Sequence, residues 1–222
     1  MSIELLVNDP ESSFEETLFG DIADALHSSG FSINQQALPP ALCQALLAEL
    51  QQLHEAAFEP AGIGRSQLHQ LDRSIRSDKI HWINHSSSAG KLWLNWCDRL
   101  QSYLNRQLYM GLFSFESHFA HYPPGASYQR HYDAFRGESN RVLSVVAYLN
   151  PNWQAHQGGA LSLYSNDQDE LGITVLPELG TVVTFLSEEF PHEVHPSLDD
   201  RYSIAGWFRV NTSIAGRIDP PR

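Results

Sequence analysis

Cysteine and positive charge are both scarce in this 222-residue chain. Its two cysteines, Cys43 and Cys97, fall in stretches that predict helix and provide no disulfide framework, so we expect them to pack as small apolar side chains in a reducing compartment. The chain has 14 Lys and Arg against 26 Asp and Glu, and the resulting net charge of −12 repels nucleic-acid phosphates and anionic lipid headgroups. A neutral peptide or a basic partner fits this charge better.

Long hydrophobic runs are absent as well. The longest apolar run, residues 142–149 with Ser144 inside it, falls far short of the ~20 residues that a membrane-spanning helix needs. The acidic first 16 residues do not resemble a signal peptide, so the sequence predicts a cytoplasmic protein without a membrane partner. The length and the hydrophobic fraction of 42% instead suit one substantial core, in one domain or at most two.

The first half of the chain predicts three helices. Apolar residues recur every four positions over residues 14–26 and indicate an amphipathic helix that ends near Gly30. Residues 40–53 indicate a second helix, because proline suits a first helical turn and leucines then recur at helical spacing. Residues 92–104 indicate the third.

The segment between the second and third predicted helices has no clear periodicity. Residues 59–74 contain Pro60, Gly62 and Gly64, which predicts a long exposed loop. A functional loop and a plain connector are equally consistent with this pattern. Residues 75–83 then predict a strand.

After Gly111 the chain changes to short runs rich in β-branched and aromatic residues, separated by turn residues. Eight strands are predicted, at residues 112–122, 127–133, 141–149, 160–164, 172–176, 181–186, 192–196 and 202–210. Short, regularly spaced strands favour a jelly-roll, or double-stranded β-helix, over a parallel sheet. The predicted fold class is α+β, with an antiparallel jelly-roll core and the N-terminal helices packed on one face.

Histidine is abundant, with 11 residues, and one group of them falls in a pattern that suggests chemistry. His131 and Asp133 lie two apart on a predicted strand, so both side chains point to the same face. His192 and His195 lie near a later strand, which a jelly-roll can bring beside the first. Two histidines and one carboxylate leave three metal positions open, which suits non-haem Fe(II), a chelating cosubstrate and O₂ better than hydrolytic zinc.

A His-x-Asp pattern alone is weak, because such a triplet is usually just a polar strand end. Arg201 strengthens it: this residue starts the last predicted strand, nine positions after His192, and Tyr148 is available from another strand. A buried guanidinium needs an anion, and its fork matches a carboxylate in bidentate fashion. A metal together with Arg201 therefore implies a dicarboxylate cosubstrate.

These motifs resemble the Fe(II)/2-oxoglutarate-dependent oxygenases, in the prolyl 4-hydroxylase branch that includes the oxygen-sensing HIF prolyl hydroxylases and their bacterial relatives. The similar segments are residues 75–83, residues 148–150 with Trp153 and Gly158-Gly159, and residues 191–194 through Arg201-Tyr202 and Trp207. The resemblance implies one jelly-roll oxygenase domain over residues 31–210, preceded by a helical extension at 1–30 and followed by a tail at 211–222.

The resemblance also implies the ligands of the metal. His131, Asp133 and His192 correspond to the iron ligands, and together with Arg201 they are the expected catalytic set. His195 competes with His192 for the third ligand position. His192 is favoured because its neighbours and its distance to Arg201 match the family pattern.

The expected cosubstrate contacts come from the same resemblance. Arg201 corresponds to the residue that pairs with the distal carboxylate of 2-oxoglutarate, and Tyr148 donates its hydroxyl to that carboxylate. Tyr122 corresponds to a tyrosine near the cosubstrate and metal, although the stretch to the first iron ligand is one residue shorter here, and Trp207 lines the site. Ala205 stands where the oxygen-sensing enzymes have a threonine, so a polar contact to the cosubstrate is lost.

The activity that the resemblance implies is hydroxylation of a prolyl residue in an intracellular protein, with release of succinate and CO₂. It requires Fe(II), 2-oxoglutarate and O₂, with ascorbate as a candidate supporting reductant. Translation elongation factor Tu is the natural first candidate for the substrate of a bacterial relative. The segment at residues 59–74 corresponds to the part of these enzymes that folds over the peptide substrate.

Two alternatives stay open from the sequence. The chain is an oxygenase of a free amino acid or another small molecule, in which case residues 59–74 are dispensable for turnover, or it is a non-catalytic module that senses iron, oxygen or 2-oxoglutarate. The intact set of His131, Asp133, His192 and Arg201 argues against the second alternative, because an inactive relative is free to lose at least one of them.

Overall fold

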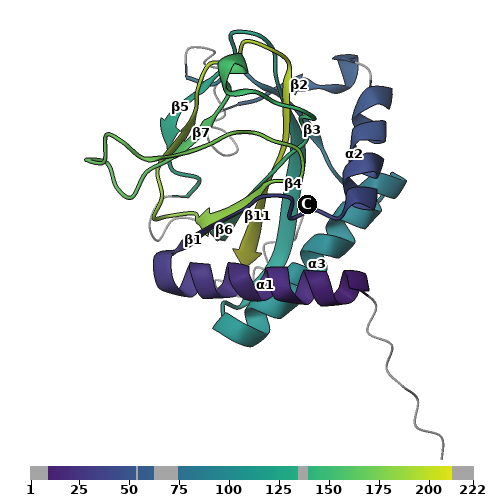
Figure 1. The fold of residues 1–222 in the computed structure, drawn as a ribbon, viewed down its shortest axis with the longest axis vertical. Coiled ribbons are helices and arrows are strands. Elements are labelled where there is room, and N and C mark those ends of the chain that lie inside the picture. Colours follow the sequence, from purple (N-terminus) through teal and green to yellow (C-terminus); the bar gives the residue numbers. More distant parts are fainter. Residues whose placement is uncertain (1–9, 54, 63–74, 135–139, 212–222) are drawn as a thin grey trace, which may run out of the picture.

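The computed structural model describes residues 10–53, 55–62, 75–134 and 140–211, and Figure 1 shows their arrangement. The helices of these segments are α1 (Pro10–Ser29), η1 (Glu55–Ala57), α2 (Pro40–Gln52), α3 (Ser88–Leu108) and η3 (Ala155–Gln157). The strands are β1 (Phe31–Asn34), β2 (Glu59–Pro60), β3 (Lys79–Trp82), β4 (Leu112–Tyr122), β5 (Tyr128–His131), β6 (Arg141–Tyr148), β7 (Leu161–Leu163), β8 (Ile173–Val175), β9 (Val182–Leu186), β10 (His192–Val194) and β11 (Arg201–Val210).

The strands form two sheets with antiparallel neighbours. The larger sheet has the order β1-β9-β6-β11-β4-β3-β2, and the smaller has the order β5-β10-β7-β8. Side chains of both sheets meet in one apolar cluster, which joins Val183 and Phe185 of the larger sheet to Leu161 and Leu163 of the smaller. The two sheets thus form the predicted jelly-roll, and all eight strands predicted after residue 111 are present as β4 to β11.

The three long helices cover the other face of the larger sheet; in Figure 1, α1 runs along the bottom and α2 and α3 lie toward the right. α1 contacts β1, β9 and α3, while α2 packs on α3 and α3 packs on β4. Their core includes Ile22, Leu46, Trp93 and Phe208, each fully buried. The predicted α+β class with helices on one face is therefore confirmed. None of the helices in the described segments has the length and apolar character to span a membrane.

Local sequence explains where two of the helices begin. α2 begins at Pro40, because the missing proline N–H costs nothing in a first helical turn. α3 begins at Ser88, before the predicted start at residue 92, because the Ser87 hydroxyl accepts a hydrogen bond from the Gly90 N–H at 2.9 Å and caps the helix. Cys43 in α2 and Cys97 in α3 are buried free thiols, as expected.

The predictions fail at three short segments. The predicted loop at 59–74 begins with strand β2, which pairs with β3. Ala61, the residue after β2, is buried. Residues 63–74 of the predicted loop lie outside the described residues. β1 was not predicted either, because a four-residue strand gives little periodicity. β3 covers Lys79–Trp82, shorter than the predicted strand at 75–83.

β11 links the helix-facing core to the interior of the jelly-roll. Its residues alternate between the two faces of the larger sheet. Ile204 and Phe208 pack in the helix-side core, whereas the Arg201 guanidinium lies over the ring of Tyr122, a member of the cluster between the sheets. Polar residues at alternate positions of β11 and its neighbours therefore face the interior, where the candidate site lies.

Candidate metal centre

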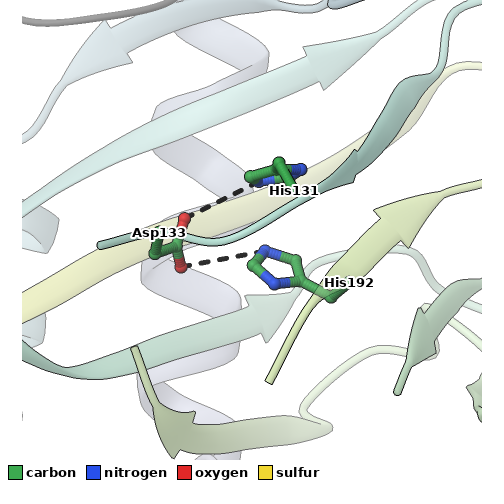
Figure 2. Close-up of side chains that lie close together, drawn as sticks. All are labelled: His131, Asp133 and His192. Atoms are coloured by element: carbon green, nitrogen blue, oxygen red, sulfur yellow. Dashed lines mark ion pairs between the residues drawn. The ribbon is translucent and has the colours of Figure 1, made fainter. Parts of the chain in front are cut away.

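Three side chains converge at the edge of the smaller sheet. His131 ends β5, Asp133 follows two residues later, and His192 begins β10, directly opposite His131 in the antiparallel register. The Nε2 of His131 lies 3.7 Å from Asp133 Oδ1, and the Nε2 of His192 lies 3.7 Å from Asp133 Oδ2 (Figure 2). Among the described residues this is the one cluster of histidine, cysteine and carboxylate ligand atoms close enough together to hold a metal, all within 4.8 Å.

Backbone carbonyls orient both imidazoles. The Nδ1 of His131 lies 2.8 Å from the Gln129 carbonyl oxygen, and the Nδ1 of His192 lies 3.2 Å from that of Phe190. A carbonyl only accepts, so Nδ1 carries the proton and the Nε2 lone pair is left for a metal. The ring of Tyr128 stacks on His131 at 3.5 Å between centroids and restricts its rotation.

The charge states suit a divalent cation. Burial lowers the pKa of His192 to about 4, so this imidazole is neutral at physiological pH. Burial alone raises the pKa of Asp133, but His192, His131 and the Ser144 hydroxyl together hold it well below its usual range. Two imidazole nitrogens and one ionised carboxylate, with no thiolate, are the donor set of the Fe(II) facial triad, so the residues present fit iron.

A buried cation lies in the same interior. Arg201 is 1% exposed, and its Nε and Nη1 donate to the Gly159 carbonyl at 2.7 Å and to the Ser203 hydroxyl at 3.2 Å. No carboxylate among the described residues lies within ion-pair distance of it. The Tyr148 hydroxyl is buried next to the Arg201 guanidinium, with no other hydrogen-bond partner in the described segments. A buried cation without a counter-charge, next to a buried hydroxyl, fits a bound carboxylate.

The other two predicted contacts occupy different ends of this interior. Tyr122 is 4% exposed, and the Arg201 guanidinium lies 4.7 Å from its ring centroid. Trp207 lies six residues further along β11 and pairs in register with Ser144, whose hydroxyl contacts Asp133. The structure therefore groups Tyr122 and Tyr148 with Arg201, and places Trp207 nearer the metal ligands.

His195 lies outside the metal group. Its Nε2 lies 2.7 Å from the Ser162 hydroxyl and 3.8 Å from Glu193 Oε1, and its side chain is 42% exposed. It is three residues past His192, beyond the last residue of β10. The geometry thus favours His192 as the third ligand.

Sequence reasoning missed two groups beside the site. Ser144 donates a hydrogen bond to Asp133 at 2.6 Å. The only sequence feature that could have indicated this role is the position of Ser144 as a polar residue inside an apolar run. His118 is 1% exposed and lies between Trp82 and Trp207, at 5.3 and 5.5 Å between ring centroids. Its sequence neighbours form no motif, so only the folded register of β3, β4 and β11 reveals it.

Comparisons with known proteins agree with this geometry. A model of the 2OG-Fe(II) oxygenase superfamily matches residues 117–209. Prolyl hydroxylase EGLN3 of Homo sapiens is 29% identical over 196 residues, which cover 84% of this chain and 81% of the relative.

Two solved structures are also similar. The crystal structure of a Pseudomonas putida prolyl-4-hydroxylase is 38% identical, with a TM-score of 0.78, and the match covers 86% of this chain and 99% of that one. A Trichoplax adhaerens prolyl hydroxylase, in complex with a peptide fragment of the hypoxia-inducible-factor oxygen degradation domain, is 28% identical with a TM-score of 0.78 over 91% and 94% of the two chains.

The family match spans all three residues of the metal group and Arg201. Fe(II) and 2-oxoglutarate, expected from the motifs, are the cofactor and cosubstrate of this family, and His131, Asp133 and His192 form its facial triad. The resemblance found in the sequence is thereby confirmed. The chain belongs to the 2OG-Fe(II) oxygenase superfamily and is a dioxygenase of the prolyl 4-hydroxylase type.

Proposed function

We propose that this chain hydroxylates a prolyl residue in a cytoplasmic protein, with release of succinate and CO₂. The observation that carries the proposal is the placement of the metal group and the unneutralised Arg201 in one buried interior. Fe(II) at three protein ligands, with 2-oxoglutarate and O₂, supplies the oxidising chemistry. The protein contributes binding, orientation and exclusion of water.

Arg201 and Tyr148 bind the distal carboxylate of 2-oxoglutarate in this proposal. The guanidinium lies 5.2 Å from the Tyr148 ring centroid, so both donors can reach one carboxylate. Ser203 holds Nη1, and the Gly159 carbonyl holds Nε, which fixes the plane of the fork. Tyr122 also lies against the guanidinium, which is 4.7 Å from its ring centroid.

An aromatic wall near the metal ligands supports a prolyl substrate. It consists of Trp82, His118 and Trp207, which lie side by side on β3, β4 and β11. Trp82 is 43% exposed and Trp207 is 6% exposed, so the wall runs from the surface into the interior. The exposed ring of Trp82 offers a flat apolar face that suits a pyrrolidine ring.

A protein is the substrate we propose, with translation elongation factor Tu as the first to test. The Trichoplax adhaerens relative is solved in complex with a peptide fragment, which supports a peptide segment as the substrate of this chain too. The identity to the Pseudomonas putida enzyme, 38%, exceeds that to the human one, 29%, which supports a bacterial protein as substrate. The net charge of −12 favours a neutral or basic peptide segment over an acidic one.

The test incubates the chain with Fe(II), 2-oxoglutarate, ascorbate and purified elongation factor Tu. Mass spectrometry should find one added oxygen on a prolyl residue, together with equimolar succinate. Asp133→Ala serves as the inactive control. Succinate formation that free proline stimulates, and that neither the protein nor its proline-containing peptides stimulate, would replace this proposal with a small-molecule oxygenase.

A further inference from the structure

Two buried serines lie behind the carboxylate that binds the metal. Ser144 on β6 is 1% exposed, and its Oγ lies 2.6 Å from Asp133 Oδ2. Ser187, directly after β9, is fully buried, and its Oγ lies 2.9 Å from that of Ser144. The Ser187 N–H donates to the Val142 carbonyl at 3.0 Å, which fixes this residue against β6. Ser144 therefore belongs to the larger sheet, and Ser187 directly follows one of its strands. Neither serine lies on the strands that carry the histidine ligands.

The donors and acceptors give this chain of hydrogen bonds a direction. An ionised carboxylate only accepts, and a serine hydroxyl has a single hydrogen. Ser144 therefore donates to Asp133, and Ser187 donates to Ser144. Successive donations polarise one another, so the hydroxyl nearest the carboxylate becomes a better donor.

This contact bears on how the carboxylate can meet a metal. Asp133 lies beyond the end of β5, and its two oxygens face different imidazoles, Oδ1 toward His131 and Oδ2 toward His192. Ser144 engages Oδ2 and limits rotation of the carboxylate. A carboxylate that used both oxygens on the metal would occupy a position that the cosubstrates need, and it would lose this hydrogen bond.

We propose that Ser144 is a positioning residue that holds Asp133 in the orientation for binding Fe(II) through one oxygen, and that Ser187 sets the direction of the Ser144 hydroxyl. The inference rests on the iron chemistry of the proposed function and is independent of the prolyl substrate. The Ser144 hydroxyl comes from the larger sheet, whereas the histidine ligands come from the smaller sheet.

The test is an anaerobic Fe(II) titration of the apo-protein, followed by 2-oxoglutarate. Ser144→Ala should raise the Fe(II) dissociation constant about 10-fold or more, and it should shift or weaken the visible charge-transfer band of the Fe(II)–2-oxoglutarate complex. Ser144→Thr keeps the hydroxyl, so its Fe(II) dissociation constant and its charge-transfer band should match those of the wild-type chain. Ser187→Ala should change the dissociation constant and the band in the same direction as Ser144→Ala, but less.

Ser117→Ala is the matched control. Ser117 is a buried serine on β4, 1% exposed, that accepts a hydrogen bond from Trp93 Nε1 on the helix side of the sheet. Its loss should leave the Fe(II) affinity and the band unchanged. If Ser144→Ala does not fold, Ser144→Cys keeps the shape with a much weaker donor and is titrated instead.

The inference is overturned if the Ser144 variant without the hydroxyl keeps wild-type Fe(II) affinity and an unchanged band. It is also overturned if Ser117→Ala loses as much Fe(II) affinity as Ser144→Ala. Failure of the wild-type chain to oxidise any prolyl substrate, with its band intact, would count against the proposed substrate and leave this assignment standing.

Discussion

Arg201 is a buried cation whose hydrogen-bond acceptors in the described structure do not neutralise its charge. Its Nε and Nη1 donate to a carbonyl and a hydroxyl, both of them neutral groups. Burying a charge in this state is costly, and an anion that enters the interior offsets that cost. In the proposed function the side chain is therefore already held in place when the carboxylate binds.

Arg201→Ala should weaken 2-oxoglutarate binding by about 2–3 kcal/mol, because it removes a charge-assisted, bidentate contact. The measurement is the 2-oxoglutarate dependence of the charge-transfer band at saturating Fe(II). The Fe(II) affinity itself should stay at its wild-type value, since Arg201 contacts none of the three ligands in the structure. An unchanged 2-oxoglutarate affinity would remove Arg201 from the cosubstrate site.

His118 makes stability depend on pH. Burial, reinforced by the Arg76 cation, lowers the pKa of His118 to about 4. In the unfolded chain this imidazole titrates near 6.5, so between pH 6.5 and 4 the unfolded state binds more protons and the free energy of unfolding falls as the pH falls. The loss reaches up to about 3 kcal/mol.

Urea unfolding of the apo-protein at pH 7, 5.5 and 4.5 measures this loss. His118→Phe keeps an aromatic ring between Trp82 and Trp207 without a titrating group, so its stability should fall less over the same range. Parallel pH profiles for the variant and the wild-type chain would show that His118 is not responsible.

The pairing of β5 with β10 builds the metal group. Alternation along a strand predicted that His131 and Asp133 share a face, and this holds. That His192 lies opposite His131 could not be predicted from the residues alone, because the register between β5 and β10 shifts after His192. The resemblance to known enzymes, more than periodicity, made His192 the stronger candidate over His195.

Helix periodicity explains which residues of the apolar stripe over residues 14–26 are buried. Residues spaced by four drift about 40° around a helix at each step, so the stripe over residues 14–26 rotates by about 120° from its first member to its last. Leu18, Ile22 and Leu26 are buried, but Phe14 is 49% exposed, and Phe19 packs in the core instead. Ser144 and β2 were missed because their contacts join segments far apart in the sequence.

His192→Ala should abolish the charge-transfer band, and His195→Ala should leave it at wild-type intensity. The two histidines are three residues apart, but β10 places only His192 within reach of Asp133. Each variant is titrated with Fe(II) and 2-oxoglutarate without oxygen. A band that survives in His192→Ala and disappears in His195→Ala would reverse the assignment of the third ligand.

The molecule divides its site between two sheets. The histidine ligands come from β5 and β10 of the smaller sheet, whereas Arg201 and Tyr148 come from β11 and β6 of the larger sheet, which the helices support. The domain boundary at residue 30 stays a prediction, although α1 already buries Ile22 and Leu26 against the helix-side core. A metal at the triad and 2-oxoglutarate at Arg201, as proposed above, would therefore join the two sheets.

Binding should consequently raise the thermal stability of the whole fold. Fe(II) alone should raise the unfolding midpoint, and 2-oxoglutarate should raise it further, each contributing about 2.7 kcal/mol when its concentration is 100 times its dissociation constant. Anaerobic thermal unfolding measures both steps. Asp133→Ala should show neither increase in the unfolding midpoint. Asp199→Ala removes an exposed carboxylate that accepts a hydrogen bond from Gln157, and this variant should show both increases. An Fe(II) step that persists in Asp133→Ala would place the metal elsewhere.

The order of the ligands along the chain has a consequence for biosynthesis. His131 and Asp133 leave the ribosome well before His192 and Arg201, and β10 and β11 complete both sheets. A chain still being synthesised therefore has neither its third iron ligand nor its carboxylate anchor until nearly the whole fold has emerged. The site can therefore hold its full set of ligands only after the strands around it have been synthesised and can pair.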